Sequence, residues 1–203
     1  MGRLTILLSV LFFGTILSAQ ETPHIKQANL PQQIAVGGGI VVARKTTVNG
    51  VKYEPTTAGA YEVSYRYRIL KHVSVQADYD LFMNTQKYLE GSKLTSIGSD
   101  VHAATGSAVI TFGNPLSKRF ESFITVGGGA LIFMPRNEGS LDRQIVSQFS
   151  VGGGDDYRLT RNLRIRAQVK GLMYKAPDFG FTSIHTTKFV DSVIPTLGIV
   201  YTF

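Results

Sequence analysis

One stretch of the sequence decides the fold: Ser192-Val193-Ile194-Pro195-Thr196-Leu197-Gly198-Ile199-Val200-Tyr201-Thr202-Phe203. Its odd positions are all apolar or aromatic, and its even positions are mostly small or polar. Side chains of a β-strand alternate between two faces with a period of two residues. The stretch is therefore predicted to be a strand with one oily face, and that face ends in two aromatic side chains.

Residues 1–20 have the pattern of a secretory signal peptide. Arg3 supplies a positive charge, residues 4–17 form an almost unbroken apolar run, and Ala19 is a small residue suited to cleavage. The run is shorter than the roughly 20 apolar residues of a transmembrane helix. We therefore expect residues 1–20 to be removed on export, residues 21–32 to form a short periplasmic tail, and residues 33–203 to form the folded domain.

Eight segments of the mature chain have the alternation or the apolar content of strands. Each is about as long as, or slightly longer than, the ~9–11 residues with which a tilted strand crosses a membrane. We predict strands at 33–44, 59–68, 72–83, 101–112, 120–134, 145–157, 163–174 and 192–203.

The links between these segments alternate in length. The short links are 69–71, 113–119 and 158–162, and the long polar links are 45–58, 84–100, 135–144 and 175–191. Short turns at the periplasmic rim and longer loops at the extracellular rim are typical of outer-membrane barrels. The pattern predicts an all-β fold, an eight-stranded antiparallel up-and-down transmembrane β-barrel with both chain ends in the periplasm.

The two faces of several segments can be told apart. One face is apolar and rich in tyrosine, whereas the opposite face is polar or charged. The signal peptide and the terminal aromatic residues favour lipid on the apolar side, so the charged side is expected to line the lumen. The predicted lumenal charges are Glu62, Arg66, Arg68, Asp78, Asp80, Arg164, Arg166 and Lys170.

These lumenal charges allow two interpretations. In a space with little water, an unpaired charge costs several kcal/mol, so the side chains are expected to pair with one another. The favoured interpretation is an interlocked set of ion pairs that plugs the lumen. The alternative is a narrow hydrated pore for ions or small solutes that is lined by the same groups.

Three Gly triplets lie within predicted strands, at 37–39, 127–129 and 152–154. A phosphate-binding glycine loop requires a strand followed by a helix, but here the strand continues on both sides of each triplet. We expect the glycines to relieve crowding where a small barrel bends, or to leave room for large lumenal side chains.

The signal peptide, the eight segments, the alternating links and the terminal Tyr201-Thr202-Phe203 together resemble the small outer-membrane β-barrel proteins of the OmpA/OmpX type. The resemblance implies that Tyr201 and Phe203 form the carboxy-terminal signal read by the barrel-assembly machinery. Periplasmic chaperones are expected as further partners during biogenesis. The resemblance also implies a monomer surrounded by lipid in the outer membrane of a Gram-negative-type bacterium.

Composition excludes several kinds of chemistry. The chain has no cysteine, so it has neither disulfides nor thiolate metal ligands. No two of its four histidines are spaced i, i+2 or i, i+4, and we expect no metal site and no cofactor. The acidic pair Asp155-Asp156 could hold a cation, but beside Arg158 and Arg161 it is more simply a surface ion pair.

The mature chain is basic. Without Arg3 it has 20 Lys and Arg residues against 14 Asp and Glu residues, a formal charge of +6. This excess fits a lumenal or solvated surplus of base, or a surface that binds acidic lipid headgroups or polysaccharide. Nucleic acid is not expected as a partner of an exported chain.

A lipid-modifying enzyme would need a nucleophile and a base at the outer rim of the barrel. Ser183 and His185 share one long link, and His102 begins a strand near the same rim, but spacing fixes no acidic residue beside them. We therefore expect a non-enzymatic protein with a structural or surface-interaction role through its extracellular loops. The narrow pore is the alternative, and the enzyme is the least favoured function.

Overall fold

The computed structural model describes residues 31–48, 51–90, 92–113, 119–136, 143–179 and 189–203. The predicted signal peptide and most of the predicted tail lie outside these residues. Within them, no helix is long and apolar enough to cross a membrane. The described strands are β1 (Gln32–Ala43), β2 (Thr46–Val48), β3 (Val51–Tyr53), β4 (Ala58–Arg68), β5 (Val73–Glu90), β6 (Lys93–Gly113), β7 (Phe120–Pro135), β8 (Gln144–Arg158), β9 (Leu163–Lys175) and β10 (Phe189–Thr202).

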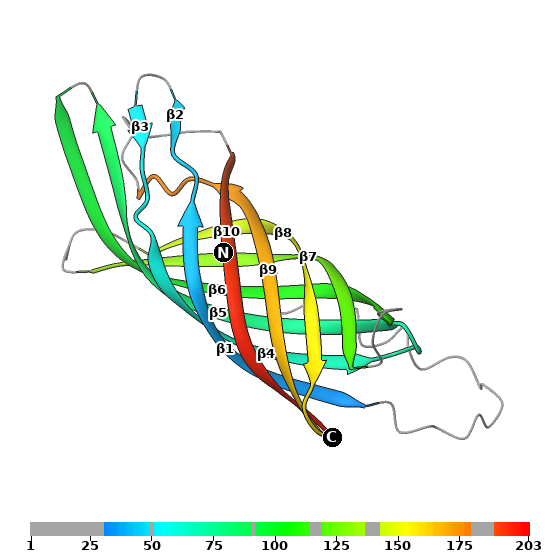
Figure 1. Ribbon diagram of the computed structural model, residues 1–203. Helices are drawn as coiled ribbons and strands as arrows, with labels where there is room; N and C mark the ends of the chain where they lie inside the picture. Colours follow the sequence, from blue (N-terminus) through cyan, green and yellow to red (C-terminus); the bar gives the residue numbers. More distant parts are fainter. Residues whose placement is uncertain (1–30, 49–50, 91, 114–118, 137–142, 180–188) are drawn as a thin grey trace, which may run out of the picture.

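Eight of the strands close into a barrel, as Figure 1 shows. Around the barrel the order is β1, β4, β5, β6, β7, β8, β9 and β10, and each strand runs antiparallel to its neighbours. Pairing of β10 with β1, from Gln33 opposite Thr202 to Ala43 opposite Ser192, closes the ring. Closure pairs the backbone groups that an open sheet edge would expose to lipid. The predicted eight-stranded antiparallel up-and-down barrel is confirmed.

Strands β5 and β6 are much longer than predicted, and the expected loop at 84–100 is wrong. The two strands stay paired from Val73 opposite Ile110 to Glu90 opposite Lys93. The polar residues that resemble a loop in the sequence still point alternately to the two faces of the strand, and Asn84 and Gln86 are buried on the inner face. Their side chains bond to one another, since Gln86 Nε2 donates to Asn84 Oδ1 at 2.7 Å.

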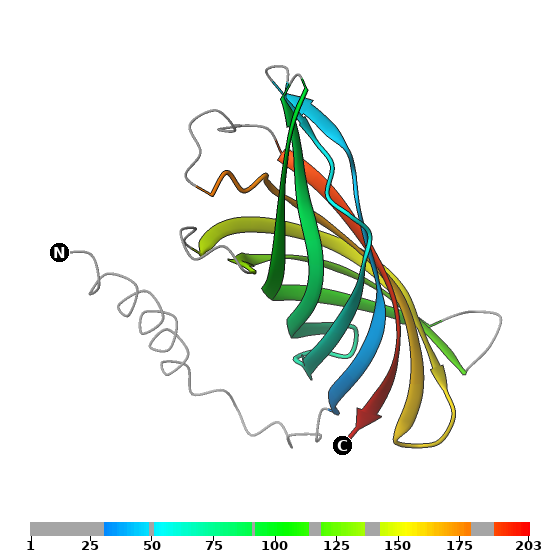
Figure 2. The same cartoon turned by 90° about the vertical axis from the view of Figure 1, so that its left-hand side faces the viewer.

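The predicted link at 45–58 also contains strands. There β2 and β3 form a hairpin, and β3 pairs with the far end of β5, with Tyr53 opposite Tyr88. The two tyrosine rings lie 5.2 Å apart, and the Tyr53 hydroxyl donates to Gln86. Figure 2 shows this hairpin beside the extended β5 and β6 at one end of the barrel. We call this raised sheet the extracellular extension.

The short-turn rim lies at the opposite end and holds the turns 69–72 and 159–162. The amide of Gln32 donates to the carbonyl of Phe203 at 3.0 Å, so both ends of the described chain lie at this rim. Short turns mark the periplasmic side of outer-membrane barrels.

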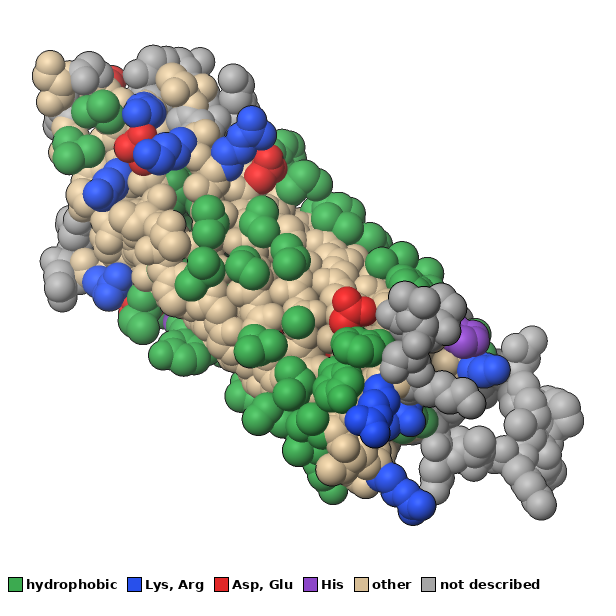
Figure 3. Space-filling model, in the orientation of Figure 1, with side chains coloured by type: hydrophobic (Ala, Val, Ile, Leu, Met, Phe, Trp, Pro, Cys, Tyr) green, Lys and Arg blue, Asp and Glu red, His purple; other side chains and the backbone are tan. Residues whose placement is uncertain are grey.

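The outer wall of the barrel is apolar. Figure 3 shows hydrophobic side chains over the middle of the barrel, with Lys and Arg gathered toward its two ends. Tyr61 is 64% exposed and Leu197 is 62% exposed, although both are large and apolar. Soluble proteins rarely expose apolar patches larger than a few hundred Å². This wall is therefore the surface that contacts lipid.

The Gly triplets mark places where one strand approaches the next very closely. The first and third glycines of each triplet share the inner face with lumenal residues, whereas the middle one faces outward. A Cβ added at Gly39 would lie 2.0 Å from the carbonyl oxygen of Pro195, and one at Gly129 would lie 1.9 Å from that of Ala104. Only glycine fits these inner positions without a movement of the backbone.

Candidate functional site in the barrel lumen

Three charged side chains from opposite walls meet inside the periplasmic half of the barrel. Asp156 on β8 accepts hydrogen bonds from Arg166 on β9, at 2.7 Å from Nε and 2.9 Å from Nη2. Arg66 on β4 approaches the same carboxylate at 3.9 Å from across the lumen. All three residues are buried, and Asp156 is only 1% exposed. The bidentate pair with Arg166 has the geometry in which guanidinium and carboxylate bind most strongly.

An aromatic ring lies against the two guanidinium groups. The centroid of Phe123 on β7 is 4.3 Å from Cζ of Arg66 and 4.9 Å from Cζ of Arg166. Cations at this distance are attracted to the face of an aromatic ring, most strongly where water is excluded. The positive charges of Arg66 and Arg166 are therefore both stabilised by the same carboxylate, Asp156, and by the same aromatic ring, Phe123.

A second ion cluster lies nearer the middle of the lumen. Lys170 on β9 donates to both carboxylate oxygens of Asp80 on β5 at 2.9 Å, and its Nζ lies 3.6 Å from Glu62 on β4. Gln168 donates to the two oxygens of Glu62 at 2.7 and 2.6 Å. These contacts run from β9 to the opposite wall of the barrel, so they cross the lumen instead of lining it.

A polar chain and a third ion cluster complete the charged interior. Arg66 Nε donates to Gln76 at 2.6 Å, and Gln76 donates to Asp78 at 2.6 Å. At the periplasmic mouth, Glu121 accepts from Arg68 at 2.8 Å and also from Arg164. Each lumenal carboxylate thus has a donor from another side chain.

Apolar and aromatic side chains fill much of the extracellular half of the lumen, beside buried polar side chains such as Gln148 and Ser192. Phe82, Ile97, Leu131, Phe133 and Tyr174 belong to one cluster, and each is at most 2% exposed. Where such side chains pack in contact, little space remains for water. We call this cluster the apolar plug. It lies between the ion clusters and the extracellular extension.

All eight predicted lumenal charges point to the inner side of the barrel. Seven of them are at most 6% exposed, and Arg68 is partly buried at the mouth. The structure brings these residues together in the three ion clusters and the polar chain described above. Whether they act as a functional site stays a prediction.

The predicted set of lumenal charges lacks two carboxylates, Asp156 and Glu121, and the prediction of a surface ion pair for Asp156 is wrong. Asp156 is not part of a surface ion pair: it lies inside the barrel, bound to Arg166, while the neighbouring Asp155 faces outward and accepts from Ser122 at 2.5 Å. Glu121 was missed as well. The period of two was an available signal for Glu121, which lies on the same face as the apolar Phe123, whereas the inner-face neighbour of Asp156 is Gly154, which has no side chain to mark a face.

The remaining candidates are not brought together in the described residues. His102 lies on the outer side of β6, where its Nδ1 is 2.5 Å from the hydroxyl of Tyr79. Ser183 and His185 lie outside the described residues. The described part of the chain contains no group of three potential metal ligands. Tyr201 and Phe203 face outward with stacked rings 6.2 Å apart, and their role as an assembly signal stays a prediction.

Comparisons with known proteins support the fold. No protein-family model matches the chain, and no curated protein matches it. Neisserial surface protein A is 16% identical with a TM-score of 0.61, covering 85% of this chain and 97% of its own. OprG of Pseudomonas aeruginosa is 12% identical with a TM-score of 0.59, covering 86% of this chain and 96% of its own.

A third similar structure is Ail, the attachment invasion locus protein of Yersinia pestis, in complex with the heparin analogue sucrose octasulfate. It is 15% identical with a TM-score of 0.51, covering 86% of this chain and 99% of its own. These similarities show a shared fold of small outer-membrane barrels. Together with the apolar outer wall, they assign the chain to the outer membrane.

Proposed function

Because this chain is an outer-membrane β-barrel of the small eight-stranded type, we propose that it is a closed, non-conducting barrel that carries an extracellular binding surface. The observation that carries the proposal is that two layers of side chains close the lumen beneath the extracellular extension. A barrel with a filled lumen cannot conduct, so its function is expected on its surface. In a rigid barrel the loops at the two rims are the parts of the surface that are exposed to water and free to bind a partner.

The closure has two chemically different layers. In the ion clusters, Lys170 with Asp80 and Arg166 with Asp156 make direct bonds, so an ion entering the lumen would have to break them. Above them, the mostly apolar side chains of the apolar plug offer a permeating ion few polar groups in place of its hydration shell. The two layers together support a closed barrel over the narrow pore.

The extracellular extension carries exposed cations near its base. Arg44, Lys45 and Lys52 have side chains that are 79%, 69% and 48% exposed. Glu54 and Asp191 are their only close carboxylate partners among the described residues, at 2.6 Å from Lys52 to Glu54 and 3.8 Å from Arg44 to Asp191. The nearby ammonium of Lys52 lowers the pKa of Glu54, so this carboxylate stays ionised at neutral pH.

Three cations against two carboxylates leave this surface positive, and we name the five residues the hairpin cluster. Its exposed ammonium and guanidinium groups suit sulfate and phosphate groups on sugars. The similar barrel Ail was solved with a sulfated sugar, which supports the same ligand class here. We propose that the hairpin cluster binds anionic polysaccharide, either free or on the lipid of the outer leaflet.

Replacing Lys45 and Lys52 with glutamine should weaken heparin binding to intact cells that display the protein. Each cation near an anionic surface contributes about 1 kcal/mol, so the double variant should bind roughly thirtyfold less tightly. Labelled heparin on whole cells is the measurement, because it reaches only the extracellular rim. Both lysines are largely exposed, so the fold should not be affected.

The matched control removes the same charge from the opposite rim through Lys71→Gln and Arg161→Gln. Cells with this control should bind heparin as the unchanged protein does. Equal binding by the Lys45 and Lys52 variant and the control, at equal surface levels, would contradict a role for the hairpin cluster.

A further inference from the structure

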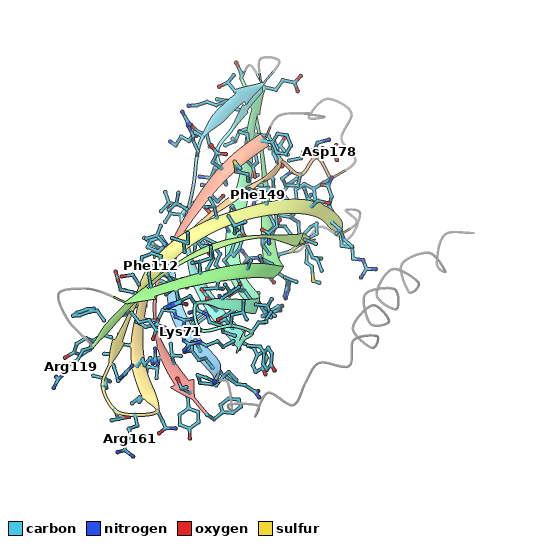
Figure 4. All side chains as sticks on the ribbon, turned by 90° about the vertical axis from the view of Figure 1, so that its right-hand side faces the viewer. Lys71, Phe112, Arg119, Phe149, Arg161 and Asp178 are labelled. Atoms are coloured by element: carbon cyan, nitrogen blue, oxygen red, sulfur yellow. The ribbon has the colours of Figure 1, made fainter. Side chains whose placement is uncertain are left out.

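A pocket of about 530 Å³ opens at the periplasmic rim, between the turn that joins β8 to β9 and the end of β10. Four arginines line it: Arg119, Arg158, Arg161 and Arg164. None of its described lining residues is acidic. Figure 4 shows Arg119 and Arg161 at this end of the barrel, far from Asp178 at the other end. Four positive charges around one space form a strong attractive field for an anion.

Buried polar atoms without partners lie in the wall of the pocket. Thr202 is 8% exposed, and its hydroxyl has no hydrogen-bond partner. Arg164 is 6% exposed, and although its Nη1 donates to Glu121, its Nε has no partner. Unsatisfied buried donors are costly and uncommon in native proteins. Each of these two side chains therefore keeps an unused donor beside the pocket.

The surrounding carboxylates do not neutralise the pocket. Glu121 is shared between Arg164 and Arg68, which leaves one positive charge in excess in that cluster. Asp156 is bound to Arg166 inside the lumen, and Asp155 lies on the outer wall with Ser122. In the described residues, neither Arg158 nor Arg161 forms a salt bridge. The charge of the turn is therefore available to a ligand.

We propose that this pocket binds an organic phosphate ester. Guanidinium groups match the geometry of phosphate oxygens with paired N–H donors, which favours phosphate among anions. The pocket volume lies in the range that holds a small organic molecule, so a phosphate with an attached glycerol or sugar fits it better than a bare ion. The rim lies at the level of lipid headgroups, so the ester comes from either a phospholipid headgroup or a soluble periplasmic molecule.

The test uses the folded mature protein with two probes. In octyl glucoside, a detergent without phosphate, glycerol 3-phosphate is titrated by calorimetry. In a second arm, retention of phosphatidylglycerol is measured by native mass spectrometry. The key variant is Arg161→Gln, which should weaken binding about tenfold by removing a charge-assisted hydrogen bond. The matched control is Lys71→Gln, which removes the same charge from another turn of the same rim and should leave binding unchanged.

Each outcome decides the proposal. Binding of glycerol 3-phosphate that is weakened by Arg161→Gln alone supports a soluble ester as the ligand. If only phosphatidylglycerol binds and only Arg161→Gln weakens its binding, the ligand is a lipid headgroup. If both probes bind and Arg161→Gln alone weakens both, the pocket accepts an ester from either source. Absence of binding in both arms, or equal loss in the two variants, overturns the proposal, because equal loss would reflect only the general charge of the rim.

Discussion

Replacement of Asp156 with asparagine should lower the free energy of unfolding by about 3–5 kcal/mol, the cost of leaving a buried charge without its partner. Asp156 is the carboxylate that Arg166 binds through two hydrogen bonds and that Arg66 faces across the lumen. The amide cannot balance two guanidinium charges that lie against one phenylalanine ring. Urea unfolding of the refolded protein in detergent micelles measures the change.

The neighbouring residue provides the control for this prediction. Asp155→Asn makes the same chemical change one residue away, on the outer wall, where the side chain is exposed and bonded only to Ser122 among the described residues. Its unfolding free energy should stay within about 0.5 kcal/mol of the unchanged protein, as for other surface substitutions. A similar loss in both variants would show that the lumenal ion cluster contributes little to stability.

Replacement of Gly39 with alanine should destabilise the barrel by about 3 kcal/mol, the upper part of the range for overpacked sites. The new Cβ would lie 2.0 Å from the carbonyl oxygen of Pro195 and 2.9 Å from Cα of Thr196. Both of these atoms belong to the backbone of β10, so the strand that closes the barrel would have to move. The folded fraction, read from the heat-dependent shift in gel mobility, should fall.

Gly38→Ala tests whether this effect is steric. Gly38 is the preceding residue on the same strand, but a Cβ there meets only the carbonyl oxygen of Ala60 at 3.7 Å, an ordinary contact. Its folded fraction should match that of the unchanged protein. If both variants lose the same folded fraction, the cause is the conformational preference of glycine and not the close approach of β1 to β10.

The alternation of side chains made the barrel and most of the charged lumen predictable. In β4 and β9 the period of two is unbroken, so Arg66, Arg166 and Lys170 could be assigned to the inner face directly. Closure followed from an even number of strands. Sequence pattern alone was enough to assign residues to the two faces, because every strand of a membrane barrel has one lipid-facing and one lumenal side.

The failures have a physical cause as well. Asp156 lies close to a short turn and Glu121 lies at the start of β7, places where charged residues are usually solvated, and the glycines at 152–154 carry no side chain to mark the face. The extension of β5 and β6 resembles a loop in the sequence because Asn84 and Gln86 are polar. Gln86, however, bonds to both Asn84 and Tyr53, and Tyr53 is distant in the sequence. Tertiary contacts of this kind leave no local signal.

Single-channel recording of the refolded mature protein in a planar bilayer tests the closed barrel most directly. The ion clusters and the apolar plug predict a silent bilayer at all applied voltages, with folding verified by the heat-dependent shift in gel mobility. Discrete, long-lived current steps that change their ion selectivity in Arg166→Gln would contradict the account and would make the lumen a pore lined by its charged residues.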